Sequence, residues 1–239
     1  MSPKAHSNSY EIVQSYGSLV PLFDFLFHNP KPDEICRRLM VAYYYKAQLF
    51  QWFGAATDGV INAMHTIVGR PLDRRFPVNA IKAHFGKSHD TELSAGHLIS
   101  IRNRHILLNV VYLDQFGTSP FHVSYKANEP HIDHIYPQSG LRNDMGLSVD
   151  EINHLGNYRF VGAKDNHRKR AEQPASYFGR LKAAGIPIDK HLLLTAESNN
   201  PKLLAWEVTA YRSFRDRRLE AIGTIASRVL NAELRAKSE

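Results

Sequence analysis

Three polar residues in the second half of the chain have the types and the spacing that hydrolysis of a phosphodiester requires. Asp133 and His134 are adjacent, and Asn166 follows further along the chain. A histidine can deprotonate an attacking water, whereas a divalent cation can neutralise charge on the scissile phosphate and the leaving oxygen. Mg²⁺ prefers oxygen ligands and keeps several waters, so one carboxylate, one amide oxygen and a substrate phosphate can hold it. Asp133 and Asn166 offer that pair of oxygens.

The local backbone decides whether these side chains can act on one phosphate. Adjacent residues on a regular strand point to opposite faces, so the chain must turn directly after the Asp-His pair. Pro137 favours such a turn. On a helix, Asn166 would share a face with Lys169 and Arg170, which follow it at i+3 and i+4. Two candidate phosphate contacts would then lie beside the amide.

Two segments of the chain resemble a known nuclease motif. Residues 131–139 read HIDHIYPQS, and residues 155–170 read LGNYRFVGAKDNHRKR. Together they resemble the His-Me finger of HNH (ββα-metal) endonucleases, in the version that ends in Asn. The resemblance implies that His134 is the general base and that Asp133 and Asn166 bind Mg²⁺, or Mn²⁺ in its place. It also implies that Asn157 supports catalysis by steadying the loop that carries the histidine.

Within the HNH class, the chain is most similar to the C-terminal nuclease domain of GmrSD-type restriction enzymes, and the HNH domain of RNA-guided CRISPR nucleases shares the motif. A looser resemblance covers QWFGAATDGVINAM (residues 51–64) and the Arg-rich C-terminal segment. These likenesses imply a DNA endonuclease that acts on double-stranded, sometimes modified DNA within a bacterial antiphage restriction system. The sequence contains no ParB-like NTPase region, so we expect an NTPase or sensor on another chain or in another part of a longer protein.

Each candidate residue also has a simpler structural interpretation. Asn157 follows a glycine and could be an ordinary turn residue, and Asn166 could cap its own helix. The basic residues of the motif would contact DNA phosphates or form a solvated helix face; they are Arg168, Lys169 and Arg170.

Two other functions compete with DNA cleavage. The first is a DNA-binding module that keeps the HNH fold without the reaction. The second is a zinc hydrolase whose ligands would be His131, His134 and His167. Zinc sites usually need three protein ligands, and no HExxH motif is present, which disfavours the zinc alternative.

Charge and composition fit a globular protein with a polyanionic partner. The 239 residues carry a formal net charge of +7, which favours association with phosphate backbones. Cys36 is the only cysteine, so an internal disulfide and a cysteine-based zinc site are excluded, and a reducing cytoplasm is expected. No apolar run approaches the roughly 20 residues of a membrane span.

Hydrophobic periodicity predicts a helical first half. We expect one helix from Pro32 or Asp33 to about Gly54 and a second over residues 57–68. Residues 93–113 predict a long buried helix, although Val110 and Val111 are also compatible with a strand. After residue 118 the order changes to strand, long loop (residues 141–157), strand and polar helix, followed by long helical structure over residues 201–234.

The expected fold class is therefore α+β, mostly helical, with a ββα-metal finger in the C-terminal half. We expect residues 1–117 to form a helical scaffold and residues 118–239 to form the nuclease module. A ββα finger has a small core of its own, so flanking helices should be needed for its stability.

Overall fold

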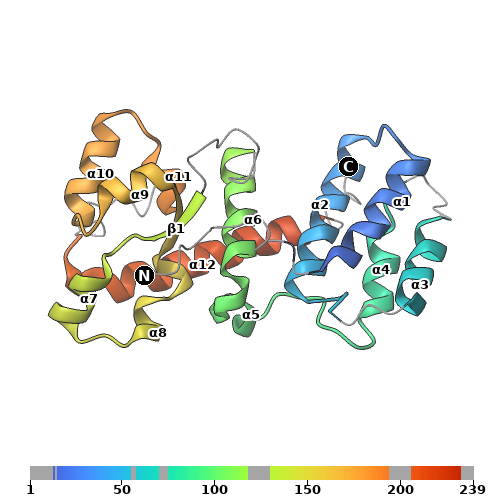
Figure 1. Cartoon of the computed structure of the whole chain (residues 1–239), viewed down its shortest axis with the longest axis horizontal. Coiled ribbons are helices and arrows are strands. Elements are labelled where there is room, and N and C mark those ends of the chain that lie inside the picture. Colours follow the sequence, from blue (N-terminus) through green and yellow to red (C-terminus); the bar gives the residue numbers. More distant parts are fainter. Residues whose placement is uncertain are drawn as a thin grey trace, which may run out of the picture. The chain divides into compact units, whose positions relative to one another are not determined.

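The computed structural model describes residues 13, 15–54, 58–69, 75–117, 130–193 and 206–232. These residues are mostly helical, with one pair of antiparallel strands followed by a helix (Figure 1). The chain forms two compact units, one made of residues 9–94 and 226–239 and the other of residues 1–8 and 95–225. The expected boundary near residue 118 lies outside the described residues, and the observed division comes earlier, after Ser94.

The first unit consists of helices packed around aromatic side chains. Its helices are α1 (Val20–His28), α2 (Glu34–Leu49), α3 (Asp58–Val68), α4 (Val78–Phe85) and the 3-10 helix Tyr16–Leu19. Asp33 caps α2 by accepting a bond from the Cys36 backbone N–H at 2.7 Å, as its position before the helix predicts. The helices expected at residues 33–54 and 57–68 are thus present, although α2 ends at Leu49.

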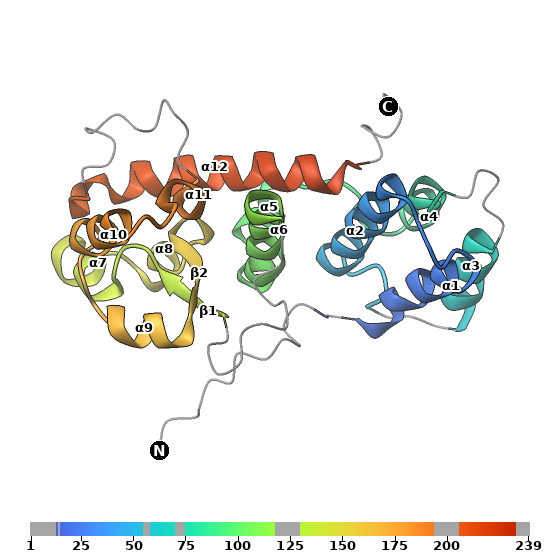
Figure 2. The same ribbon diagram turned by 90° about the horizontal axis from the view of Figure 1, so that it is seen from above.

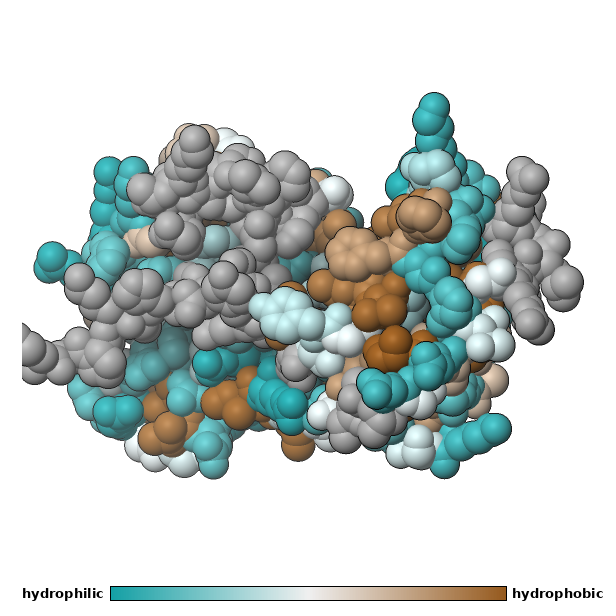
Figure 3. Space-filling view, turned by 45° about the vertical axis from the view of Figure 1, so that its right-hand side comes forward, coloured by the Kyte–Doolittle hydropathy of each residue, from teal (hydrophilic) through white to brown (hydrophobic). Residues whose placement is uncertain are grey.

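Some apolar side chains of the first unit lie on its surface. The exposed residues Tyr16, Val20, Phe23 and Phe27 follow one another at helical spacing along the 3-10 helix and α1. Figure 3 shows apolar side chains gathered among hydrophilic ones in the right-hand part of that view. Among the described residues of the whole chain, no helix combines the length and apolarity that crossing a membrane requires.

The second unit contains the strand pair and the helices around it. Its helices are α5 (Ala95–Ile99), α6 (Arg104–Phe116), α7 (Gln138–Met145), α8 (Val149–Ile152), α9 (Ala163–Lys169), α10 (Pro174–Ala183), α11 (Ile188–Leu192) and most of α12 (Tyr211–Leu230). Short 3-10 helices cover Ile101–Asn103, Leu155–Asn157 and Val208–Ala210. Figure 2 shows α12 running beside α10 and α11.

Strands β1 (Pro130–His134) and β2 (Tyr158–Gly162) pair in antiparallel register, which places Asp133 opposite Arg159 and His134 opposite Tyr158. Helix α9 packs against both strands, and α6 packs against β2. The two strands and the polar helix expected from the sequence are therefore present. The helix expected over residues 93–113 begins at Ala95 and is broken at Ser100, followed by a 3-10 turn and α6.

The connection between the strands differs from the expected long loop, because it contains α7 and α8. Ser148 and Glu151 form a reciprocal capping box at the start of α8, a Ser-x-x-Glu signal already present in the sequence. The apolar side chains of this connection join a buried cluster with those of α10, α11 and α12: Ile135, Tyr136, Leu141, Leu147, Ile152, Tyr177, Phe178, Ile188, Leu192, Tyr211 and Phe214. The connection between the strands thus shares its core with the flanking helices.

Candidate functional site

A pocket of about 300 Å³ is lined by the end of β1, the turn that follows it, and the C-terminal part of α9 with the residues after it. The predicted residues Asp133, His134, Asn166 and Arg170 line it. Its remaining described lining comes from Ile132, Pro137, Gln138, Ser139 and Ala171. The chain turns after His134, and Asp133 and His134 both line the pocket although they are adjacent residues of β1. Residues far apart in the sequence therefore converge on a space large enough for a phosphate group.

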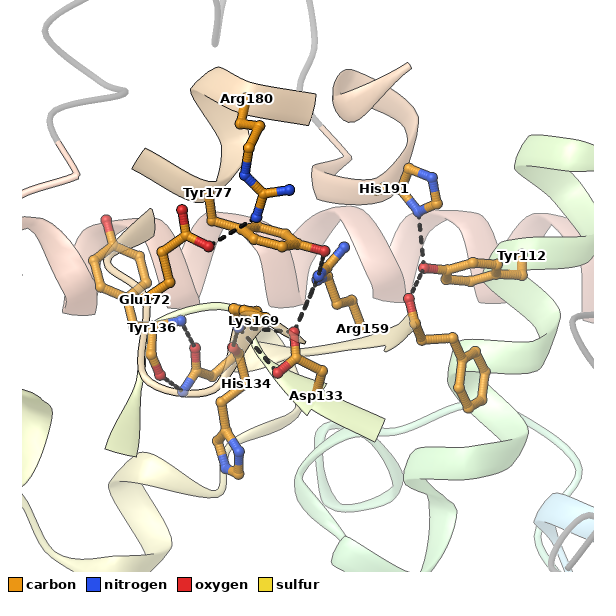
Figure 4. Close-up of polar contacts among 12 residues, drawn as sticks. Tyr112, Asp133, His134, Tyr136, Arg159, Lys169, Glu172, Tyr177, Arg180 and His191 are labelled. Carbon is orange, nitrogen blue, oxygen red and sulfur yellow. Dashed lines mark hydrogen bonds and ion pairs between the residues drawn. The ribbon is translucent and has the colours of Figure 1, made fainter. Parts of the chain in front are cut away.

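Asp133 lies in a buried cluster of charges. Its carboxylate accepts bonds from Lys169 Nζ at 2.9 Å (Oδ1) and 2.8 Å (Oδ2), and from Arg159 Nε at 3.1 Å (Oδ2). The phenol of Tyr177 accepts a bond from Arg159 at 2.8 Å. Figure 4 shows the Asp133 carboxylate among these cations, with the His134 ring extending away from them.

His134 is held on the other side of the strand. Its Nε2 lies 2.9 Å from Oδ1 of Asn153, and its ring contacts Tyr158 edge-on with centroids 4.8 Å apart. Since an amide oxygen can only accept, Nε2 carries the proton and Nδ1 keeps a lone pair. Burial, opposed in part by the Asn153 bond, lowers the pKa of His134, so the ring is neutral at pH 7. Gln138 Nε2 lies beside the same ring, 3.2 Å from Nε2 and 3.4 Å from Nδ1.

Asn157 is fully buried and joins the two ends of the connection between the strands. Its side-chain oxygen accepts a bond from the Tyr136 N–H at 2.9 Å, and its amide group donates to the carbonyls of Tyr136 at 3.2 Å and Ile152 at 3.1 Å. The Asn157 carbonyl also accepts from Ile135 at 2.8 Å. Its side chain therefore fixes the backbone immediately after His134.

The basic residues of α9 have different surroundings. Arg168 is exposed, with its side chain 80% accessible, and approaches Asp165 at 4.0 Å. Arg170 is exposed, lines the pocket, and has an unusual backbone conformation with φ of 48° and ψ of −123°. Lys169 is 2% exposed and bound to Asp133, so the expected phosphate contact by Lys169 does not fit its position. The reason is that α10 covers this side of α9, as the Tyr177 ring 5.4 Å from Lys169 Nζ shows.

The histidines of the zinc alternative do not converge with His134. The rings of His131 and His167 lie 6.5 Å apart and are not lining residues of the pocket. Within the described ranges, no group of three or more His, Cys, Asp and Glu side chains is arranged to hold a metal ion.

The donor set instead fits a hard cation. Asp133 and Asn166 line the same pocket, and their side chains carry a carboxylate and an amide oxygen, which are ligand types that Mg²⁺ prefers. A carboxylate oxygen can accept two bonds, and among the described residues Oδ1 of Asp133 accepts only the bond from Lys169. One lone pair of this oxygen is thus left for a metal ion.

Several residues of the site were not singled out from the sequence. Asn153 orients His134, and Arg159 and Tyr177 enclose Asp133. The guanidinium of Arg104, at the start of α6, lies 5.7 Å from the centre of the Tyr158 ring, and its charge helps to lower the pKa of His134. For Arg159, the sequence signal was its position two residues after Asn157, at the start of the second strand. The antiparallel register then places Arg159 opposite Asp133.

Comparison with protein-family models and with curated proteins finds no match to this chain.

Proposed function

We propose that this chain is a metal-dependent endonuclease of the HNH class, which hydrolyses DNA phosphodiester bonds with a ββα-metal finger formed by β1, β2 and α9. The observation that carries the proposal is the single pocket lined by Asp133, His134, Asn166 and Arg170. A neutral histidine, two oxygen ligands and an exposed arginine are the groups that hydrolysis of a phosphodiester requires. The net charge of +7 supports a nucleic-acid substrate.

In this proposal, His134 is the general base. Nδ1 accepts the proton of the attacking water, while the bond from Nε2 to Asn153 fixes the tautomer and orients the ring. The lowered pKa keeps the base unprotonated at neutral pH. Asn157 is a positioning residue, since it holds the backbone that follows the histidine.

Asp133 and Asn166 would hold the cation, Mg²⁺ or Mn²⁺, in this pocket. When bound, this cation would neutralise charge on the phosphate and on the leaving oxygen. Lys169 and Arg159 hold the Asp133 carboxylate in place, whereas Arg170 and Arg168 are available to bind DNA phosphates. Membership of an antiphage restriction system, with an NTPase or sensor partner, belongs to the same proposal.

Cleavage of supercoiled plasmid tests the proposed function. We expect the protein to nick or linearise double-stranded DNA with Mg²⁺ or Mn²⁺, EDTA to stop the reaction, and His134→Ala to lose about 10²-fold or more of the rate. Asn166→Ala should also lose activity, and the exposed Lys182→Met serves as a control that should keep it.

The competing candidate is a DNA-binding module without catalysis. Salt-dependent binding of duplex DNA together with no cleavage under any divalent ion would favour that module over the nuclease. The bond from His134 to Asn153 orients the ring and selects one tautomer. This favours the nuclease over the binding module, because a domain that only binds DNA needs no positioned base.

A further inference from the structure

The charges around Asp133 do not balance. The side chains of Lys169, Arg159 and Asp133 are 1%, 3% and 7% exposed, and both cations contact the same carboxylate. Two positive charges therefore share one negative charge, inside the protein, at the position proposed to bind a metal ion. Buried charges interact strongly because water screens them little.

No other carboxylate of the described residues corrects this excess within the pocket. Asp133 is the only acidic residue among the described residues that line it. Glu172, the acidic residue next to Lys169, accepts bonds from Ser176 at 2.8 Å and from Arg180 at 2.8 Å. Its charge is thus largely compensated by Arg180.

The surrounding aromatic ring stabilises the cations and adds no charge. The Tyr177 ring centre lies 4.8 Å from the Arg159 guanidinium, 5.4 Å from Lys169 Nζ and 5.3 Å from the Arg180 guanidinium. The negative face of an aromatic ring attracts cations, so this ring helps to hold both partners of Asp133 in place (Figure 4). Burial lowers the pKa of Lys169, and the neighbouring Asp133 carboxylate opposes that shift.

A divalent cation entering this pocket alone would meet a site that is already positive. Its ligand Asn166 is neutral, and the remaining charged group at the pocket, Arg170, is a further cation. A phosphodiester entering with the metal ion supplies the missing negative charge and additional oxygen ligands.

We propose that Asp133 and Asn166 bind a divalent cation strongly only together with a DNA phosphate, and that the buried charge of Lys169 sets this requirement. The inference rests on the proposed function, which assigns the metal ligands. It makes substrate binding the event that assembles the metal site, so that the protein without DNA holds little metal.

Binding of Mn²⁺, followed by the loss of its free-ion electron paramagnetic resonance signal, tests the inference without turnover. The protein is the full chain with His134→Ala, which keeps both metal ligands and prevents cleavage. We expect saturating duplex DNA to tighten Mn²⁺ binding about tenfold or more, and Mn²⁺ to tighten duplex binding by the same factor. The same chain with Asp133→Asn added corrects for Mn²⁺ bound by the DNA itself.

Substitutions at position 169 then test the role of the lysine charge. In the His134→Ala background, Lys169→Met should bind Mn²⁺ more tightly in the absence of DNA and reduce the coupling to less than about threefold. Lys169→Arg keeps the charge and should keep the coupling, as should Lys182→Met, which removes an exposed lysine. Circular dichroism verifies that each variant is folded.

The possible outcomes separate this inference from the proposed function. Equal Mn²⁺ affinity with and without duplex, in a chain whose wild type cleaves plasmid, overturns the inference and leaves the nuclease standing. Full coupling in folded Lys169→Met overturns the role of the lysine. Failure of the protein to bind duplex and to cleave plasmid overturns both.

Discussion

The side-chain amide of Asn157 bonds to both the N–H and the carbonyl of Tyr136, so one buried side chain fixes the backbone two residues after His134. A third bond, to the carbonyl of Ile152, ties the same amide to the end of α8. These bonds close the connection between the strands into a loop of defined shape. The backbone that follows the proposed base His134 is therefore held by Asn157, the residue directly before β2.

Replacing Asn157 with Ala should destabilise the protein by about 3 kcal/mol, because three bonds are lost and the backbone groups of Tyr136 and Ile152 stay buried without partners. Urea unfolding monitored by circular dichroism measures the change. Asn153→Ala is the control, since this half-buried residue bonds to the His134 ring and should change stability by less than about 1 kcal/mol while lowering cleavage. Equal stability losses in the two variants would contradict the prediction.

Gly156 is required by the close approach of α12. A Cβ built at this position would lie 2.2 Å from the carbonyl oxygen and 2.9 Å from the carbonyl carbon of Arg215. Gly156→Ala should therefore cost about 3 kcal/mol, since backbone must move to accommodate the methyl group. Gly179, exposed within α10, has open space around it, so Gly179→Ala should stabilise the protein by about 0.5–1 kcal/mol. Thermal unfolding of the two variants provides the comparison.

The charge excess around Asp133 predicts unequal effects of two substitutions. Asp133→Asn leaves two buried cations without a counter-ion and should cost roughly 3–5 kcal/mol. Lys169→Met leaves Arg159 and Asp133 as a neutral pair and should cost less, about 1–2 kcal/mol. Denaturant unfolding of both variants at the same pH and salt concentration tests this order, and a larger cost for Lys169→Met would refute the charge count.

Arg170 combines an unfavourable backbone with an exposed side chain at the pocket. A non-glycine residue at φ of 48° and ψ of −123° is strained, so Arg170→Gly should raise stability by about 1 kcal/mol. The same variant should bind duplex DNA more weakly and reduce the slope of log affinity against log salt by about one unit. Arg168→Ala, on the exposed face of α9, should weaken binding without the gain in stability. Fluorescence anisotropy and thermal unfolding separate the two effects.

Acid should destabilise the fold through its buried histidines. Burial lowers the pKa of His191 to about 4, while Tyr112 lies 3.0 Å from its Nδ1, and the pKa of His134 is lowered too. Because the unfolded chain takes up protons near pH 6.5 and the folded chain takes them up only at lower pH, stability is full above 6.5 and is lost as the pH falls toward 4. We expect a loss of about 2 kcal/mol from His191, which His191→Gln should remove from urea titrations at pH 7.5, 6 and 5.

The strand pair, α9 and the main helices could be predicted from the sequence, because hydrophobic periodicity and turn residues mark them locally. The convergence of Asp133, His134 and Asn166 on one pocket followed from the motif and its spacing. Their chemical roles, the bound ion and the DNA substrate stay predictions, since geometry alone does not test them.

The burial of Lys169 could not be predicted. A lysine among basic residues on a short polar helix is typical of a solvated face, and only the packing of α10, through Tyr177, turns this residue inward. The pairing of Asp133 with Arg159 depends on the register of β1 against β2. Because α7 and α8 lie between the two strands in the sequence, no local sequence signal indicates this register. The helices α7 and α8 were missed because their polar composition resembled a loop.

The buried cluster that supports the turn after β1 includes Tyr211 and Phe214, which belong to α12. During synthesis on the ribosome, the strand pair and α9 emerge well before that helix, and the turn after His134 has no completed core until α12 follows. A nascent chain would therefore lack the completed core of this turn until α12 has emerged.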